Sequence, residues 1–188
     1  MKAPNVVTAF AKAAIHYGAT IAEHKEVTSI QSHDGYVVSV TTADGDTILC
    51  NQLILAAGAW AQQCGKWLNI ALPVIPQRGQ LLALRQPSPP IRHIIIGHGI
   101  YLAPKQDGTV LVGATKEEVG FDTRVTAGGA LGLLEAAVQL IPALEGCAIE
   151  RLCAGLRPKT PDTFPILGGP QDGKMSYLPL VTVVSEFS

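Results

Sequence analysis

Apolar and polar residues alternate with a helical period at the start of the chain and with a strand period directly after it. Residues 5–17 place apolar side chains at helical spacing and are followed by Gly18, so they predict an amphipathic helix with a glycine cap. Short β-prone runs follow, separated by Asp34-Gly35 and Asp44-Gly45, which are strong hairpin signals. The pattern predicts an antiparallel meander with strands at residues 26–33, 36–42 and 47–49.

The middle of the chain predicts a second, larger antiparallel sheet. Residues 53–58 form an apolar run ending in small residues, which is typical of a buried parallel strand entering a tight turn, and residues 59–68 predict a helix. Residues 126–141 predict a helix with one apolar face, ended by Pro142. The larger sheet is expected from β-prone runs at residues 80–84, 91–97, 100–103 and 109–115, and another strand is expected at residues 149–156, stopped by Pro158. These elements indicate an α+β protein.

The composition points to a globular chain with a sizeable core. Hydrophobic residues make up 47% of the 188 residues and charged residues 15%, against roughly 25% charged in average soluble proteins. The formal net charge of −1 gives no electrostatic reason to bind nucleic acid or an anionic membrane. A second interpretation of the low charge is that a further polypeptide segment covers part of this surface.

Cysteine usage favours a reducing setting. The sequence has four cysteines, Cys50, Cys64, Cys147 and Cys153. They form no CxxC pair and lie near no histidine cluster at zinc spacing, so we expect buried free thiols and no metal site. Lys12 and His16 interrupt the first apolar run, which excludes a signal peptide there, and no segment approaches the roughly 20 apolar residues of a membrane span. A cytoplasmic location is expected.

Nothing in the sequence matches the glycine-rich loop that binds a dinucleotide. Such a loop has the form G-x-G-x-x-G between a strand and a helix, where backbone N–H groups face the pyrophosphate. Gly97-His98-Gly99 lacks the third glycine, and Gly128-Gly129 with Gly132 opens a helix without a preceding strand. Both sets are interpreted as structural glycines.

The run Ala154-Gly155-Leu156-Arg157-Pro158 carries the most specific candidate side chain. Pro158 favours an extended backbone at Arg157, so its guanidinium projects from a rigid strand end. Its fixed fork of donors suits a carboxylate held in bidentate fashion. From the sequence alone, a surface or structural ion pair is the favoured role for Arg157.

Six segments in this order resemble the D-amino-acid-oxidase family of FAD-dependent oxidoreductases, and most closely its glycine oxidases of thiazole biosynthesis. The segments are Glu26 to Ile30, Ile54 to Trp60, Pro73-Val74 to Arg78-Gly79-Gln80, Tyr101 to Pro104, Gly108 to Thr115 and Ala154 to Pro158. The resemblance implies a substrate-binding antiparallel sheet with helices, joined to part of a divided FAD-binding α/β domain. It places the FAD-binding part at residues 1–72, the substrate-binding part at residues 73–153, and a return to the FAD-binding part at residues 154–188.

The resemblance also implies site residues. Arg157 matches the arginine that pairs with the substrate carboxylate, and Tyr101 matches a tyrosine lining the same pocket. Val27 matches a position whose backbone contacts the FAD, and Gly58 lies where the chain passes close to the dinucleotide. The alternative is that Val27 is an ordinary strand residue and Tyr101 an ordinary tyrosine at the edge of the core. No catalytic side chain is implied.

The implied reaction relies on positioning, with the electronics supplied by the cofactor. The clamped amino-acid or secondary-amine substrate would lose its Cα–H as hydride to FAD while the amine becomes an imine. Oxygen would then be reduced to peroxide, and the imine would hydrolyse to a 2-oxo acid. The resemblance suggests a role in thiamine biosynthesis and leaves a homo-oligomeric state of the whole enzyme open.

Two departures from the family pattern stand out. Lys116 follows Gly113-Ala114-Thr115 where an apolar pocket residue is expected, so it would either alter substrate choice or point to solvent. Residues 174–188 form an aberrant tail, in which residues 180–188 stand in place of a Gly-His-x-Arg-x-Gly-Ile loop. Our hypothesis is a frameshift in the gene with Met1 as an internal start, which translation of the genomic DNA in all frames would test.

Two other classes of function fit the same residues. The chain could be an inactive, truncated remnant of such an oxidase, or a carboxylate-binding module that uses Arg157 without redox chemistry. Flavin colour and peroxide formation would distinguish the enzyme from both.

Overall fold

The computed structural model describes residues 3–34 and 36–168. These residues divide between two compact units. Unit 1 comprises Met1–Ile21 and Arg78–Leu156, and unit 2 comprises Ala22–Gln77 and Arg157–Ser188. The boundary falls within two long strands, β4 (Ile75–Arg85) and β8 (Ile149–Lys159).

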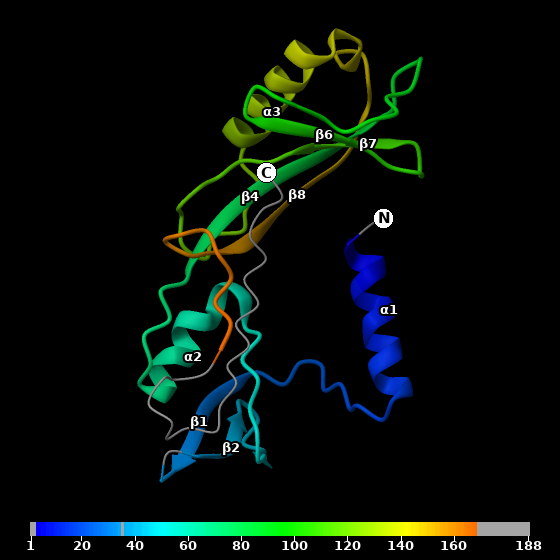
Figure 1. The fold of residues 1–188 in the computed structure, drawn as a ribbon. Coiled ribbons are helices and arrows are strands. Elements are labelled where there is room, and N and C mark those ends of the chain that lie inside the picture. Colours follow the sequence, from blue (N-terminus) through cyan, green and yellow to red (C-terminus); the bar gives the residue numbers. More distant parts are fainter. Residues whose placement is uncertain (1–2, 35, 169–188) are drawn as a thin grey trace. The chain divides into compact units, whose positions relative to one another are not determined.

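The larger sheet has five strands in the order β5-β6-β7-β4-β8 (Figure 1). Antiparallel ladders join β4 to β7, β7 to β6 and β6 to β5. The tight β6–β7 connection uses the Asp107-Gly108 turn, in which Gly108 has a φ of +79° and the Thr109 hydroxyl donates to the Asp107 carboxylate at 2.7 Å. The other three strands are β5 (Ile95–Gly97), β6 (Ile100–Pro104) and β7 (Thr109–Gly113). The predicted second antiparallel sheet is confirmed.

Helix α3 (Ala127–Leu140) lies along one face of this sheet (Figure 1). The Thr126 hydroxyl caps its start by accepting a hydrogen bond from the Gly129 N–H at 3.2 Å, and a short 3₁₀ turn, Pro142–Leu144, follows its end. Inward residues of alternate strand positions pack under the helix, and each fully buried aliphatic side chain contributes about 1.5–3 kcal/mol. This core consists of Leu82, Leu84, Ile100, Leu102, Val110, Val112, Leu133, Ala137 and Leu144.

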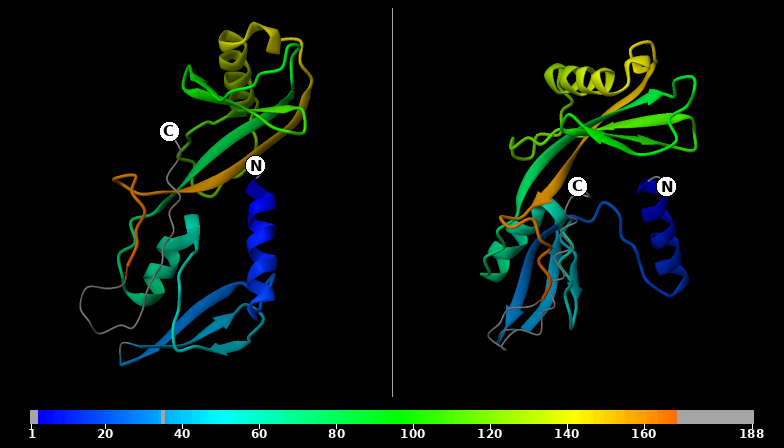
Figure 2. Two further views of the ribbon diagram at one scale, coloured as in Figure 1. Left: turned by 45° about the vertical axis from the view of Figure 1, so that its right-hand side comes forward. Right: turned by 45° about the horizontal axis from the view of Figure 1, so that its top comes forward.

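Unit 2 contains the predicted meander, whose strands β1 (Val27–His33), β2 (Tyr36–Thr42) and β3 (Thr47–Leu49) pair antiparallel (Figure 2). Its other elements are a 3₁₀ turn, Gly58–Trp60, and helix α2 (Ala61–Leu68). A separate core of buried side chains holds them together: Val37, Leu55, Ala61, Cys64, Leu68, Leu72 and Val74.

The first helix, α1 (Ala3–His16), also forms as predicted. Gly18 adopts a φ of +92°, and the Ala19 N–H bonds to the Ala14 carbonyl at 3.0 Å, so the expected glycine cap is present. None of the helices in the described residues is long and apolar enough to cross a membrane.

Three details of the sequence-based prediction are wrong. Residues 53–57 form no strand, because no neighbouring backbone pairs with them among the described residues, although Leu55 is buried. The strand expected at residues 91–97 begins only at Ile95. Pro158 does not end β8, which continues to Lys159; β8 is the edge strand of the sheet, where a missing N–H is tolerated. The aberrant tail lies outside the described residues.

Candidate functional site

Tyr101 lies on the face of the larger sheet that is opposite α3. Its neighbours Ile100 and Leu102 point into the core beneath α3, so the alternation of a strand directs Tyr101 to the other face. In register, Tyr101 stands between Ile96 of β5 and Gly113 of β7. The tyrosine is half-buried, and Ala83 and Ala103 on the same face are buried.

Gly113 provides the surface on which the tyrosine ring rests. A Cβ atom at this glycine would lie 2.8 Å from the Tyr101 hydroxyl oxygen and 2.9 Å from Cζ, both far inside normal contact distance. The φ angle of Gly113 lies outside the left-handed region, so this angle does not require glycine there. The close approach of the Tyr101 ring leaves little room for a side chain at Gly113.

Arg157 lies near the end of β8, half-buried and in extended conformation, as the following proline predicted. It belongs to unit 2, whereas Tyr101 belongs to unit 1. A shared pocket of Arg157 and Tyr101 therefore stays a prediction.

The two predicted FAD contacts both belong to unit 2. Val27 begins β1 opposite Thr42, where the ladder between β1 and β2 shifts register. Gly58 opens the 3₁₀ turn with a φ of +54°, and a Cβ atom placed on it would meet nothing within 4 Å. Val27 therefore sits at a ladder irregularity, and Gly58 borders open space that a ligand could enter.

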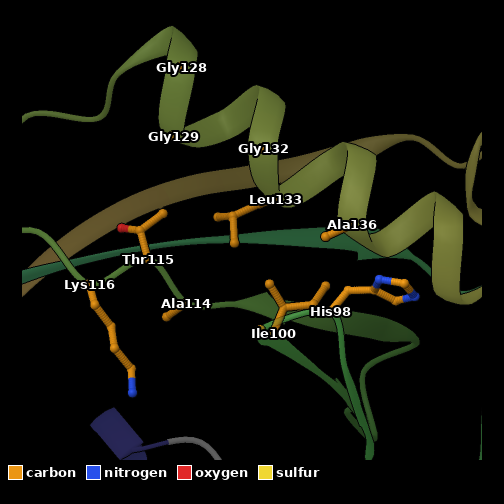
Figure 3. A pocket seen from close by; sticks show the side chains of 11 residues that line it. His98, Ile100, Ala114, Thr115, Lys116, Gly128, Gly129, Gly132, Leu133 and Ala136 are labelled. Atoms are coloured by element: carbon orange, nitrogen blue, oxygen red, sulfur yellow. The ribbon is translucent and has the colours of Figure 1, made fainter.

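A pocket of about 360 Å³ lies within unit 1, between α3 and the adjoining ends of β6 and β7. Figure 3 shows the α3 glycines above the segment that carries Ala114, Thr115 and Lys116. The Lys116 side chain is exposed and extends away from α3. The lining residues are His98, Gly99, Ile100, Ala114, Thr115, Lys116, Gly128, Gly129, Gly132, Leu133 and Ala136.

A partly buried polar cluster, centred on Glu117, adjoins this pocket through Thr115. Arg78, only 4% exposed, donates to Glu117 Oε2 from Nε at 3.2 Å and from Nη2 at 2.5 Å. Gln80 and the Thr115 hydroxyl donate to Oε1 at 2.7 and 2.5 Å. The Arg78 guanidinium, and after it the Thr115 hydroxyl, hold the pKa of the Glu117 carboxyl below its ordinary value. Arg78 also pairs with Asp122 at 3.0 Å.

Gln80 connects this cluster to the start of α3. Its amide nitrogen donates to the Thr126 hydroxyl at 3.0 Å, and its amide oxygen accepts from the Thr126 N–H at 2.8 Å. Gly129 permits the approach, since a Cβ atom there would lie 2.3 Å from Gln80 Nε2. A single side chain thus ties β4, the segment after β7 and α3 together.

Reasoning from the sequence misses the roles of Gln80 and Glu117. The available signal is a glutamine at the start of the run Gln80 to Leu84, whose other residues are apolar, combined with paired glycines at a helix start. Neither feature identifies its partner without the fold. Among the described residues, no group of His, Cys, Asp and Glu side chains could hold a metal ion.

The fold matches about half of a solved glycine oxidase. The structure superposes on the crystal structure of glycine oxidase from Geobacillus kaustophilus with a TM-score of 0.86 and 32% identity, covering 96% of this chain and 49% of that one. The sequence matches the family described as FAD dependent oxidoreductase (DAO) over residues 1–183. The chain belongs to this family.

Curated relatives agree with that assignment. Glycine oxidase from Geobacillus kaustophilus is 35% identical over 170 residues, which are 89% of this chain and 44% of the relative. The bifunctional protein ThiO/ThiG of Synechocystis is 38% identical over 173 residues, covering 89% of this chain and 26% of that protein. The chain therefore spans less than half the length of these relatives.

Proposed function

We propose that this chain is the substrate-binding part and a portion of the FAD-binding part of a glycine-oxidase-like amine oxidase. The observation that carries the proposal is the half-buried Tyr101, whose ring lies on the bare backbone of Gly113 on the face of the larger sheet opposite α3. Family membership and the similarity to glycine oxidases support the same conclusion.

In the proposed reaction, Arg157 binds the carboxylate of a small amino acid or secondary amine through two parallel N–H···O bonds. The Tyr101 hydroxyl donates a further hydrogen bond to the same carboxylate. Together they would fix the substrate so that its Cα–H faces one direction, which is positioning catalysis. FAD, when bound, supplies the acceptor for the hydride.

The residues present fit FAD at two positions. Gly58 leaves open space beside a backbone that can be approached closely, and Val27 stands where the β1 ladder is irregular. We infer that these two would contact the cofactor. The sequence contains no G-x-G-x-x-G loop, so the phosphates would need donors from elsewhere.

A carboxylate-binding module without redox chemistry is the second candidate, supported by Arg157, which is half-buried near the end of β8. A cytoplasmic location is also proposed, supported by four cysteines that are all free thiols, of which only Cys64 is buried.

Purified protein separates the two candidates. Flavin absorbance near 450 nm and peroxide release from glycine, sarcosine or D-alanine would support the oxidase. Colourless protein that binds glycolate, a small carboxylate, would support the module. Protein that binds neither flavin nor glycolate would contradict both the oxidase and the module.

The role of Arg157 is tested by comparing two single variants, Arg157→Ala and Arg151→Ala. The second is the control, because it removes an exposed arginine from the same strand. Loss of a charge-assisted pair should weaken glycolate binding roughly tenfold or more, since such bonds contribute about 1.5–3 kcal/mol. Arg151→Ala should leave it unchanged. Equal affinity of both variants would remove Arg157 from the site.

A further inference from the structure

The φ angle of Gly113 does not require glycine, but a neighbouring side chain in the sheet leaves little room for a Cβ atom there. Antiparallel register places Ile96, Tyr101, Gly113 and Leu81 in one row across four strands, all on the face opposite α3. Tyr101 does not stand upright in this row. Its ring covers the gap at Gly113, with Cε1 as well as Cζ and the hydroxyl oxygen within 3.3 Å of the Cβ position.

The segment that follows Gly113 is anchored. Thr115 and Glu117 are bonded to β4 through backbone and side chain: the Gln80 N–H donates to the Thr115 hydroxyl at 2.9 Å, and the Arg78 and Glu117 backbones exchange hydrogen bonds of 2.8 and 3.0 Å. Gly113 itself pairs with Leu81 of β4. The surface beneath Tyr101 is therefore fixed on both sides of the glycine.

We propose that Gly113 is a positioning residue that sets the height of the Tyr101 hydroxyl above the sheet, and thereby its reach to the substrate carboxylate. This inference rests on the function proposed for Tyr101. A side chain at Gly113 would project from the sheet on the same face as the ring. It would displace the ring outward and move the hydroxyl away from the position at which it would donate a hydrogen bond to the substrate carboxylate.

The test is a double-mutant cycle in the full 188-residue chain. Gly113→Ala is made alone and combined with Tyr101→Ala or Tyr101→Phe, and each variant is measured for thermal midpoint and for glycolate affinity by calorimetry. Gly146→Ala is the matched control, because a Cβ atom there meets nothing within 4 Å and its φ is not left-handed.

Gly113→Ala should lower the thermal midpoint by roughly 2–8 °C, as expected for overpacking in a chain of this size. It should weaken glycolate binding roughly 3- to 10-fold, the effect of one lost hydrogen bond. Both effects should disappear when Gly113→Ala is combined with Tyr101→Ala. When Gly113→Ala is combined with Tyr101→Phe, the loss in thermal midpoint should persist, because the ring remains. The effect on glycolate affinity should vanish, because the hydroxyl is gone.

The outcomes distinguish this inference from the proposed function. A thermal loss that is equal with and without the tyrosine ring would overturn the inference, because the ring would then not rest on Gly113. Gly113→Ala could lower the thermal midpoint only when the Tyr101 ring is present, while Tyr101→Ala leaves glycolate affinity unchanged. The contact between Tyr101 and Gly113 would then stand, but the binding role proposed for Tyr101 would fail, and the positioning role of Gly113 with it.

Discussion

Replacing Gln80 with leucine should reveal how much the buried polar cluster contributes to stability. Leucine nearly matches glutamine in volume, so the change removes hydrogen bonds without opening a large cavity. Gln80 is 1% exposed, and its amide makes bonds of 2.7 Å to Glu117, 3.0 Å to the Thr126 hydroxyl and 2.8 Å from the Thr126 N–H. All three are lost in Gln80→Leu.

The size of the loss follows from which partners remain unsatisfied. Glu117 Oε1 keeps its bond from the Thr115 hydroxyl, and the Thr126 hydroxyl keeps its bond from Gly129. The Thr126 N–H has only water as an alternative, and Thr126 is half-buried. An unsatisfied buried polar group costs about 1–3 kcal/mol, so we expect a loss of about 2 kcal/mol in unfolding free energy.

Far-UV circular dichroism during urea unfolding is the appropriate assay. Both tryptophans, Trp60 and Trp67, belong to unit 2, so tryptophan fluorescence would not report directly on a change in unit 1. The control is Gln106→Leu, at an exposed position in the β6–β7 turn, where the change should stay within about 0.5 kcal/mol. If Gln80→Leu lost no more than this control, the cluster would contribute nothing net and our account of it would be wrong.

Three further predictions concern single positions. Gly129→Ala should destabilise the chain by about 1–3 kcal/mol because its Cβ would lie 2.3 Å from Gln80, whereas Gly132→Ala on the same helix, which meets nothing, should stabilise it by about 0.4–1 kcal/mol in chemical denaturation. The pKa of the Glu117 carboxyl is depressed from 4.5 in the folded state. The contribution of the ionised carboxylate to folding stability is therefore fully present above pH 4.5 and is lost as the pH falls through the folded pKa. The unfolding midpoint of Glu117→Gln should therefore decline less, as the pH is lowered from 7 to below 4, than that of the unmodified chain; parallel declines would refute this. Burial raises the pKa of the Cys64 thiol, so a thiol reagent at pH 8 should modify the other three cysteines first, as peptide mapping would show.

Local signals in the sequence predict most of the fold. Helix α3 is identified by its apolar face and by Pro142, and the meander by its Asp-Gly turns, because these features act within a few residues. The errors arise where a distant partner decides the outcome. Residues 53–57 have the composition of a strand, but a strand exists only when another backbone pairs with it. Pro158 continues a strand because β8 lies at an edge, which no local pattern reveals.

The candidate site depends even more on distant partners. Glycines outside turns are usually interpreted as structural, and for Gly113 and Gly129 that interpretation is incomplete. Neither has a left-handed φ, and each is opposed by a large side chain from a neighbouring strand: Tyr101 over Gly113 and Gln80 against Gly129. The two contacts involve the end of β7 and the start of α3, which border the pocket together with the start of β6. A glycine that its own backbone does not require is therefore informative, because it indicates where another residue needs the space.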